Sequence, residues 1–189
     1  MRIRLATPDP DDDPVPEGWL AVGYVLSGEP PRTVLAYDPE RRPHAVVAGR
    51  EPHLMDRAEV NHALVAAVDE AGLALWPGGH THALPEALGI ARRTLARDRI
   101  EKAGLPPMVL SVLGSAAQGR QPELTGLMLT ALGRFANEGA SEPDEAGRMQ
   151  EAVEFAEGVA RLLGKVRRNK LLKKMMAPGA VNPFLGTEE

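Results

Sequence analysis

The side chains best suited to bind an anionic partner are concentrated in two short stretches of this sequence. Residues 91–105 hold five Lys/Arg against two acids, and residues 161–176 hold seven Lys/Arg and no acid. The other 158 residues carry ten Lys/Arg against 24 acids, although the net charge of the whole chain is only −4. Guanidinium and ammonium groups bind phosphate oxygens through charge-assisted hydrogen bonds, and clustering them creates a local field. Both stretches are therefore candidate phosphate-binding sites.

The first stretch belongs to the segment ALGIARRTLARDRIEKAG, residues 87–104, which contains a turn of small residues around Gly89. The pattern predicts two short helices, at about 82–88 and 92–103, with Gly104 closing the second. A short helix, a tight glycine turn and a second helix form the layout of many DNA-binding proteins.

Residues 82–104 resemble the helix-turn-helix family of DNA-binding motifs. Gly89 stands at the position of the turn glycine. Four apolar residues stand where that family packs one helix on the other: Leu84, Leu88, Ile90 and Leu95. The resemblance implies a DNA-reading helix that carries Arg92, Arg93, Thr94, Ala96 and Arg97. In the major groove Arg binds guanine or a phosphate, and Thr contacts a phosphate or a thymine methyl group.

Two residues depart from the family pattern. Pro85 stands where the first helix usually has a small residue, although proline is tolerated in a first turn. Asp98 stands where the family has an apolar residue, and its charge opposes phosphates.

The second stretch ends a predicted long helix over residues 141–176, where basic residues alternate with Leu and Met. The full set of predicted DNA-binding residues is Arg92, Arg93, Thr94, Arg97, Arg99, Lys102, Lys165, Arg167, Arg168, Lys170, Lys173 and Lys174. Those of the second stretch are expected to hold backbone phosphates whatever the base sequence, and the affinity should depend steeply on salt. A solvated helix end, favoured by the helix dipole, is the alternative. A membrane-surface role is a further alternative, but it lacks an aromatic anchor.

Candidate catalytic and metal-binding residues are few. His80 and His82, with Glu86 four residues on, have types that bind metal ions, but no further ligand is placed by spacing. The chain has no cysteine, and the run GVARLLGKV (158–166) lacks the spacing of a phosphate-binding loop. We therefore predict a non-enzymatic protein without a metal or cofactor.

The elements that must position these residues indicate an α+β fold. Short apolar runs at 3–5, 19–26, 32–37 and 44–49 predict a small N-terminal antiparallel β-meander. The acidic, proline-rich segment 8–18 is predicted to be a loop that does not pack.

A mainly helical domain is expected to follow. Asp56 caps a helix that Gly72 ends, and further helices run from Pro107 to Ala117 and from Pro122 to about Glu138. The long basic helix comes last; Gly158 and Gly164 are expected to bend it or to allow a close helix contact. The expected regions are 1–55 (β-rich), 56–140 (helical), 141–176 (long helix) and 177–189 (flexible tail).

No apolar run reaches the ~18–20 residues of a membrane span, and no signal peptide is recognised, so a cytoplasmic protein without a membrane partner is expected. The predicted function is non-enzymatic binding of DNA, duplex rather than single-stranded, by a small regulator or a DNA-maintenance (repair) accessory factor. The narrow apolar stripe of the long helix favours a homodimer. The alternative is an assembly protein, in which the long helix pairs with another helix and the tail segment NPFLG (182–186) docks on a protein partner.

Overall fold

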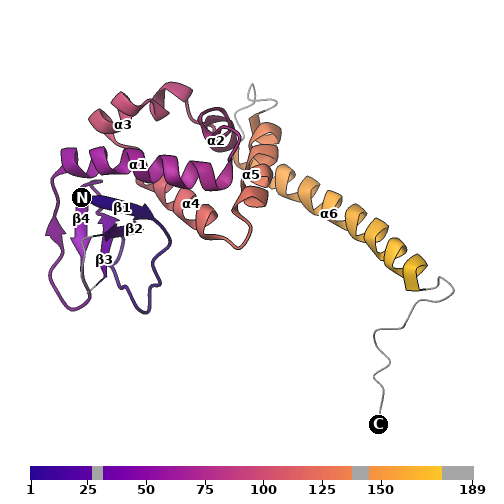
Figure 1. Cartoon of the computed structure of the whole chain (residues 1–189), viewed down its shortest axis with the longest axis horizontal. Coiled ribbons are helices and arrows are strands. Elements are labelled where there is room, and N and C mark those ends of the chain that lie inside the picture. The colour runs from indigo at the N-terminus through magenta and orange to yellow at the C-terminus, as the bar shows by residue number, and fades with distance from the viewer. Residues whose placement is uncertain (27–31, 138–144, 176–189) are drawn as a thin grey trace, which may run out of the picture. The chain divides into compact units, whose positions relative to one another are not determined.

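The N-terminal sheet is a five-stranded antiparallel meander in which each strand pairs with the next one along the chain (Figure 1). The strands are β1 (Arg2–Leu5), β2 (Leu20–Leu26), β3 (Thr33–Tyr37), β4 (Pro43–Val46) and β5 (His53–Leu54). The computed structural model describes residues 1–26, 32–137 and 145–175; in the last range the side chains of Glu145, Ala146, Met149, Val166 and 168–175 are not described. The predicted α+β class and N-terminal meander are confirmed. The two-residue strand β5 is too short to leave an alternating pattern and was missed.

The two faces of the sheet carry different side chains, because successive residues of a strand point to opposite sides. Ile3, Leu5, Val22 and Leu35 belong to the main hydrophobic core. That core also contains residues of helices α1 (Arg57–Leu75) and α4 (Pro107–Gln118), which pack against β1 and β2. The opposite face contributes a smaller cluster, made of Ala6, Tyr24, Val34, Ala36 and Val46.

The expectation that residues 8–18 do not pack is wrong. This loop covers the smaller cluster: Val15 and the neighbouring Trp19 pack against it. Asp13 is 8% exposed, and its carboxylate accepts a hydrogen bond of 2.8 Å from the Tyr24 hydroxyl. Prolines restrict the unfolded chain, so ordering such a loop costs less entropy than its composition suggests.

Helix α1 begins as predicted and ends later. The Asp56 carboxylate caps it by accepting a hydrogen bond of 2.9 Å from the Glu59 amide, and its apolar face, which includes Val60, Leu64 and Val68, is buried. The helix continues past Gly72 to Leu75, so the prediction that Gly72 ends it is wrong. A Cβ atom at Gly72 would lie 2.7 Å from the His80 ring, so this glycine permits the close approach of His80.

Helix α5 (Pro122–Asn137) packs against α1, α4 and α2 (His80–Leu88), and two buried glycines allow its close approach to the end of α1 and to α2. A Cβ atom at Gly126 would collide with the Leu75 carbonyl oxygen, and one at Gly133 would lie 2.7 Å from backbone atoms of Ala87 and Glu86. The buried Trp76 indole donates to the Gly126 carbonyl and the Thr130 hydroxyl, both at 3.0 Å. The predicted starts of α4 and α5 are confirmed, and each ends within one residue of its expected position.

Residues 1–137 form one compact unit, and residues from 138 onward form a second. In the first unit α1 lies between the sheet and the segment formed by α2 and α3 (Arg97–Ala103) (Figure 1). In the second, helix α6 (Glu145–Met175) is continuous; residues 141–144 and 176 of the predicted long helix lie outside the described residues. A Cβ atom at Gly158 or Gly164 would meet no described atom within 4 Å, so neither glycine serves a close contact among the described residues.

Candidate nucleic-acid interface

Helix α2 and the turn after it provide the first half of the predicted DNA-binding motif. Gly89 has a left-handed backbone (φ 62°, ψ 26°), and the amides of Gly89 and Ile90 both donate to the Pro85 carbonyl. Leu84 is fully buried, and Leu88 and Leu95 pack against the same core. The predicted first helix and its glycine turn are therefore confirmed. The helix begins at His80 rather than at 82, so Pro85 lies in its interior and not in its first turn.

The second half differs from the prediction, because no single helix spans residues 92–103. Residues Arg92–Leu95 form a 3-10 turn, Ala96 is extended (φ −62°, ψ 135°), and α3 covers Arg97–Ala103. Leu95 and Ile100 both contact the core, yet on one α-helix they would point about 140° apart. The break at Ala96 allows both side chains to reach the core. Asp98 is exposed in the first turn of α3, where the helix dipole favours a negative charge.

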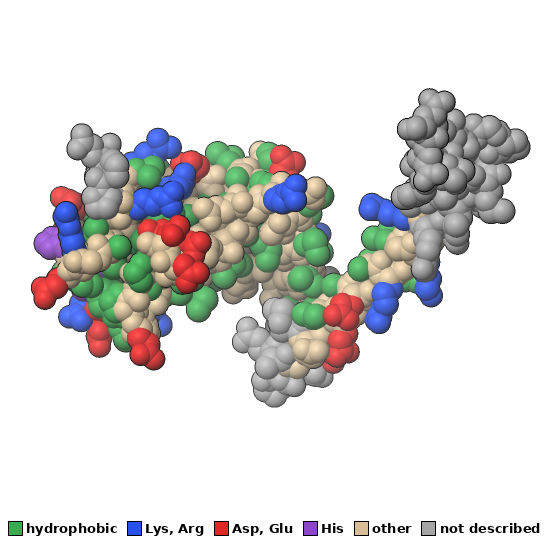
Figure 2. Space-filling model, turned by 90° about the horizontal axis from the view of Figure 1, so that it is seen from below, with side chains coloured by type: hydrophobic (Ala, Val, Ile, Leu, Met, Phe, Trp, Pro, Cys, Tyr) green, Lys and Arg blue, Asp and Glu red, His purple; other side chains and the backbone are tan. Residues whose placement is uncertain are grey.

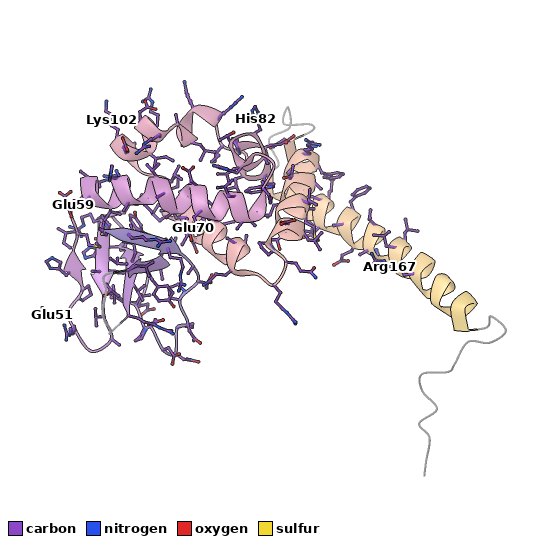
Figure 3. All side chains as sticks on the ribbon, in the orientation of Figure 1. Glu51, Glu59, Glu70, His82, Lys102 and Arg167 are labelled. Atoms are coloured by element: carbon purple, nitrogen blue, oxygen red, sulfur yellow. The ribbon has the colours of Figure 1, made fainter. Side chains whose placement is uncertain are left out.

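All five basic residues of this segment are exposed. Arg92 donates to the His82 ring at 2.9 Å, and Arg97 pairs with Glu101 at 3.2 Å. Arg93, Arg99 and Lys102 form no ion pair or side-chain hydrogen bond with any described residue. Lys102 projects from α3 on the side away from the sheet (Figure 3). We call residues 92–102 the basic segment; its Thr94 is half-buried.

Helix α6 carries the second set of predicted residues. Lys165 and Arg167 are exposed. Arg168, Lys170, Lys173 and Lys174 lie on the helical backbone, but their side chains are outside the described residues. From Glu151 onward, acids come first along this helix and bases follow, which Figure 2 shows as red and then blue side chains. The tail 177–189, with the predicted peptide segment NPFLG, is also outside the described residues.

The side chains of the candidate metal site face different partners. The His80 ring pairs with Asp69 at 3.1 Å, the His82 ring accepts from Arg92, and the Glu86 carboxylate pairs with Arg134 at 2.6 Å. The hydrogen bond from Arg134 lowers the pKa of Glu86, although burial opposes the shift. In the part of the chain that the structure describes, no three His, Asp or Glu residues are placed to hold a metal ion.

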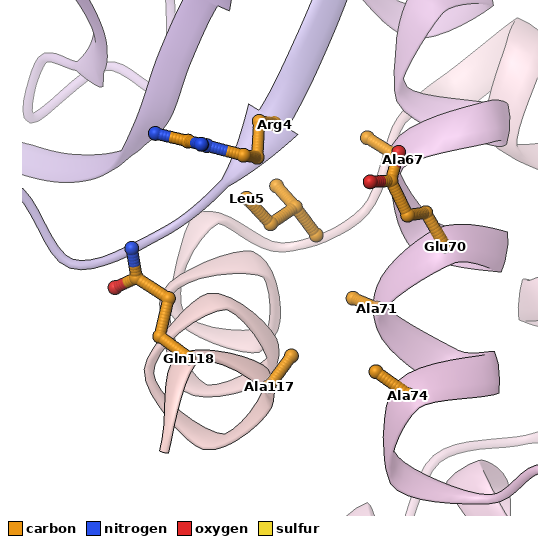
Figure 4. A pocket seen from close by; sticks show the side chains of 8 residues that line it. All are labelled: Arg4, Leu5, Ala67, Glu70, Ala71, Ala74, Ala117 and Gln118. Atoms are coloured by element: carbon orange, nitrogen blue, oxygen red, sulfur yellow. The ribbon is translucent and has the colours of Figure 1, made fainter. Parts of the chain in front are cut away.

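One cavity, of about 140 Å³, lies where β1 meets α1 and α4 (Figure 4). Half of its lining residues are alanines: Ala67, Ala71 and Ala74 from α1 and Ala117 from α4. Arg4 points away from Glu70 across the rim, and its guanidinium lies 5.6 Å from the centre of the Tyr24 ring. The Gln118 side-chain oxygen accepts from the Thr7 amide at 2.8 Å. These residues hold no nucleophile next to a base, so this cavity is a packing gap.

A second cavity brings together residues that the sequence analysis did not single out. It is lined by Tyr37, Arg41, Arg57, Asn61 and residues 103–107. These positions come from β3, the β3–β4 turn, α1 and the α3–α4 connection, so no local motif links them. The only local signal was the pair of arginines in the turn DPERRP (38–43).

No helix among the described residues is both long enough and apolar enough to cross a bilayer. Comparison of the chain with protein-family models, with curated protein sequences and with solved structures gives no match.

Proposed function

We propose that this chain is a non-enzymatic DNA-binding protein that contacts duplex DNA through the basic segment. The observation that carries the proposal is the set of three exposed side chains, Arg93, Arg99 and Lys102, that have no ion-pair partner among the described residues. Elsewhere in the first unit Arg2, Arg42 and Arg134 pair with carboxylates, and the arginines without an ion pair, such as Arg50 and Arg120, are far apart in the sequence. The basic segment is distinguished by three such cations within ten residues. Cations without an internal partner are available to phosphates.

The basic half of α6 supplies the second contact in this proposal. Lys165 and Arg167 are exposed on a helix whose residues 161–175 contain no acid. Such a helix binds phosphates irrespective of base sequence, whereas Arg92, Arg93, Thr94 and Arg97 would read bases or position the duplex. One element that holds phosphates and another that reads bases would suit a small regulator or a DNA-maintenance accessory factor. Because 92–103 is not one helix, any insertion into the major groove would use the short helix α3 or the turn before it.

The proposal is tested by fluorescence anisotropy with labelled duplex and single-stranded DNA at several salt concentrations. The variant Arg93→Ala/Arg99→Ala/Lys102→Ala is compared with Arg50→Ala/Arg120→Ala, which removes two exposed arginines from other places on the first unit. Each lost phosphate contact should lower the slope of log affinity against log salt by about 0.9 for duplex DNA. We expect a smaller slope in the triple variant and an unchanged slope in the control. Equal slopes in both, or no binding at low salt, would contradict the proposal.

A second candidate function, assembly through α6, is favoured by an exposed apolar face on that helix. Val159, Leu162 and Leu163 are 40%, 63% and 54% exposed and lie within about 100° of one another around the helix axis. Exposed large apolar side chains on one face are typical of helix pairing. The occupant that fits best is the α6 helix of a second copy in antiparallel orientation.

The order of charges supports this orientation. Glu151, Glu154 and Glu157 precede Val159, and Arg161, Lys165 and Arg167 follow it. A two-fold axis through Val159 would place residues 150–157 of one copy beside 161–168 of the other. Acids would then lie near bases, within a Debye length of about 8 Å, whereas parallel pairing would set acids beside acids.

Sedimentation equilibrium tests the pairing of α6. If α6 pairs with itself, the wild-type chain is a dimer that weakens with salt, and Val159→Asp/Leu163→Asp is a monomer. Gln150→Asp, on the polar face, should leave the dimer intact. A wild-type chain that stays monomeric at every concentration and at low salt would rule out this assembly and leave the basic half of α6 free for DNA.

A further inference from the structure

The cavity beside α3 has a lining rich in hydrogen-bond donors and positive charge. It has a volume of about 200 Å³, and its charged lining residues are Arg41 and Arg57. Tyr37 and Asn61 add a hydroxyl and an amide, and no acid lines it. Pockets for drug-sized ligands are larger, roughly 300–1,000 Å³, so this cavity suits a small group.

Arg41 is held toward this cavity by an unusual backbone. It is the one non-glycine residue with a positive φ (61°) among the described residues. Its amide donates to the Asp38 carbonyl at 2.9 Å in the β3–β4 turn. Gly or Asn adopts this positive-φ conformation more readily than Arg does. A residue kept in an unfavourable conformation at a cavity is a sign of function.

Three acids that are close in sequence to residues lining the cavity are already paired with other residues. Asp38 and Glu40 pair with Arg42 at 2.7 and 3.2 Å, and Glu101 pairs with Arg97 at 3.2 Å. The Arg41 side chain has no ion pair or hydrogen bond with any residue that the structure describes. Its charge is therefore not neutralised within the described part of the molecule.

The other donors also keep capacity for a ligand. One nitrogen of the Arg57 guanidinium donates to the Ala103 carbonyl at 3.3 Å, which leaves further N–H groups. Tyr37 is 7% exposed, and no described residue accepts a hydrogen bond from its hydroxyl. Burial raises the pKa of Tyr37 to about 12, against the opposing charge of Arg57, so the hydroxyl remains a donor at neutral pH.

We propose that this cavity binds a phosphate group, with Arg41 and Arg57 as its charge partners and the Tyr37 hydroxyl as a further donor. Two cations and a neutral hydroxyl around a space of this size match a tetrahedral anion. The phosphate has two possible sources. It is a free phosphate or phosphate ester, or it is a backbone phosphate of the DNA bound by α3, since Ala103 and Gly104 also line the cavity. The second source rests on the proposed DNA-binding function.

The test uses the full chain, inorganic phosphate in isothermal titration calorimetry, and labelled duplex DNA in anisotropy at fixed salt. Arg41→Gly removes the guanidinium and suits the positive φ, so the fold is retained, which thermal melting checks. Arg57→Gln is the second variant, and Arg50→Ala is the control. Loss of one charge-assisted hydrogen bond should weaken binding about tenfold or more.

Three results are distinguished. Phosphate binding that weakens in both variants and not in the control supports the site with a free anion as its ligand. No binding of phosphate, but weaker DNA binding by Arg41→Gly and Arg57→Gln at unchanged melting temperature, supports it with a DNA phosphate. If neither probe responds to the variants, the phosphate site is overturned, and wild-type DNA binding in the same titration shows whether the proposed function survives it.

Discussion

At the scale of single residues, the best-defined polar cluster surrounds Asp38 at the end of β3. Its side chain is 2% exposed and accepts hydrogen bonds from the Arg42 amide at 2.8 Å and the Arg42 side chain at 2.7 Å. The His44 ring lies 3.1 Å away. Burial alone would raise the pKa of Asp38, but these hydrogen bonds and the Arg42 charge lower it to about 2. The hydrogen bonds to the ionised carboxylate therefore stabilise the β3–β4 turn.

This cluster should make stability depend on pH in the acid range. Because the pKa of Asp38 is lower in the folded chain than in the unfolded one, its contribution is present above about pH 4 and disappears as pH falls toward 2. We expect Asp38→Asn to be less stable than wild type at pH 6, with the difference shrinking as the pH approaches 2. Urea denaturation at several pH values measures it.

Glu51→Gln is the matched control for this experiment, since Glu51 is an exposed carboxylate near the same sheet (Figure 3). Its stability difference from wild type should stay small and nearly constant with pH. A constant difference for Asp38→Asn as well would contradict the role given to the ionised carboxylate.

At the scale of elements, two helices use glycine in opposite ways. Gly133 of α5 lies against the backbone of α2, whereas a Cβ atom at Gly158 of α6 would meet no described atom within 4 Å. Both are glycines inside helices, where alanine is intrinsically better by about 0.8–1 kcal/mol. Packing therefore decides whether a Gly→Ala substitution raises or lowers the stability.

We expect Gly133→Ala to lower the free energy of unfolding by roughly 1–3 kcal/mol, because the added methyl group forces α5 away from α2. Gly158→Ala should instead raise the helical content or thermal stability of α6 slightly. Thermal melts followed by circular dichroism compare the two. A destabilising Gly158→Ala would indicate a close contact of that face with a partner.

The sequence predicted elements where a local signal coincided with their packing. The short apolar runs of β1 and β3, the Asp56 cap and the prolines that open α4 and α5 were sufficient. It failed where distant contacts decide: the break at Ala96 exists because Leu95 and Ile100 share one core, and Gly72 faces His80 instead of ending α1.

The candidate site was predictable to a similar extent. Charge clustering located the basic segment, but not which arginines already have partners: Arg92 and Arg97 do, and Arg93 and Arg99 do not among the described residues. The cavity beside α3 could not be predicted from the sequence, because Tyr37, Arg41 and Arg57 are brought together by tertiary packing.

At the scale of the whole molecule, the first unit contains every residue of the main core and of the smaller cluster on the other face of the sheet. We therefore expect a fragment of residues 1–137 to fold by itself. Its melting should remain cooperative and near that of the full chain in calorimetry or circular dichroism. A fragment that melts without a cooperative transition would show that the first unit needs the second.

The same fragment tests how much of the proposed DNA binding comes from each unit. It retains the basic segment and lacks α6. The slope of its log affinity for DNA against log salt should therefore equal the amount by which Arg93→Ala/Arg99→Ala/Lys102→Ala lowers the slope of the full chain. A fragment that binds no DNA at low salt would assign the interaction to α6.

The sequential order of the strands has a consequence for the chain as it leaves the ribosome. Every strand pairs with the one made just before it, so the sheet requires no residue beyond Leu54. Its inner face, however, is covered only after α1 and α4 have been made, some sixty residues later. During that interval Ile3, Val22 and Leu35 would be open to other nascent chains, and exposed apolar surface of this kind attracts chaperones. The order of synthesis, more than final stability, then sets when this protein is most prone to aggregate.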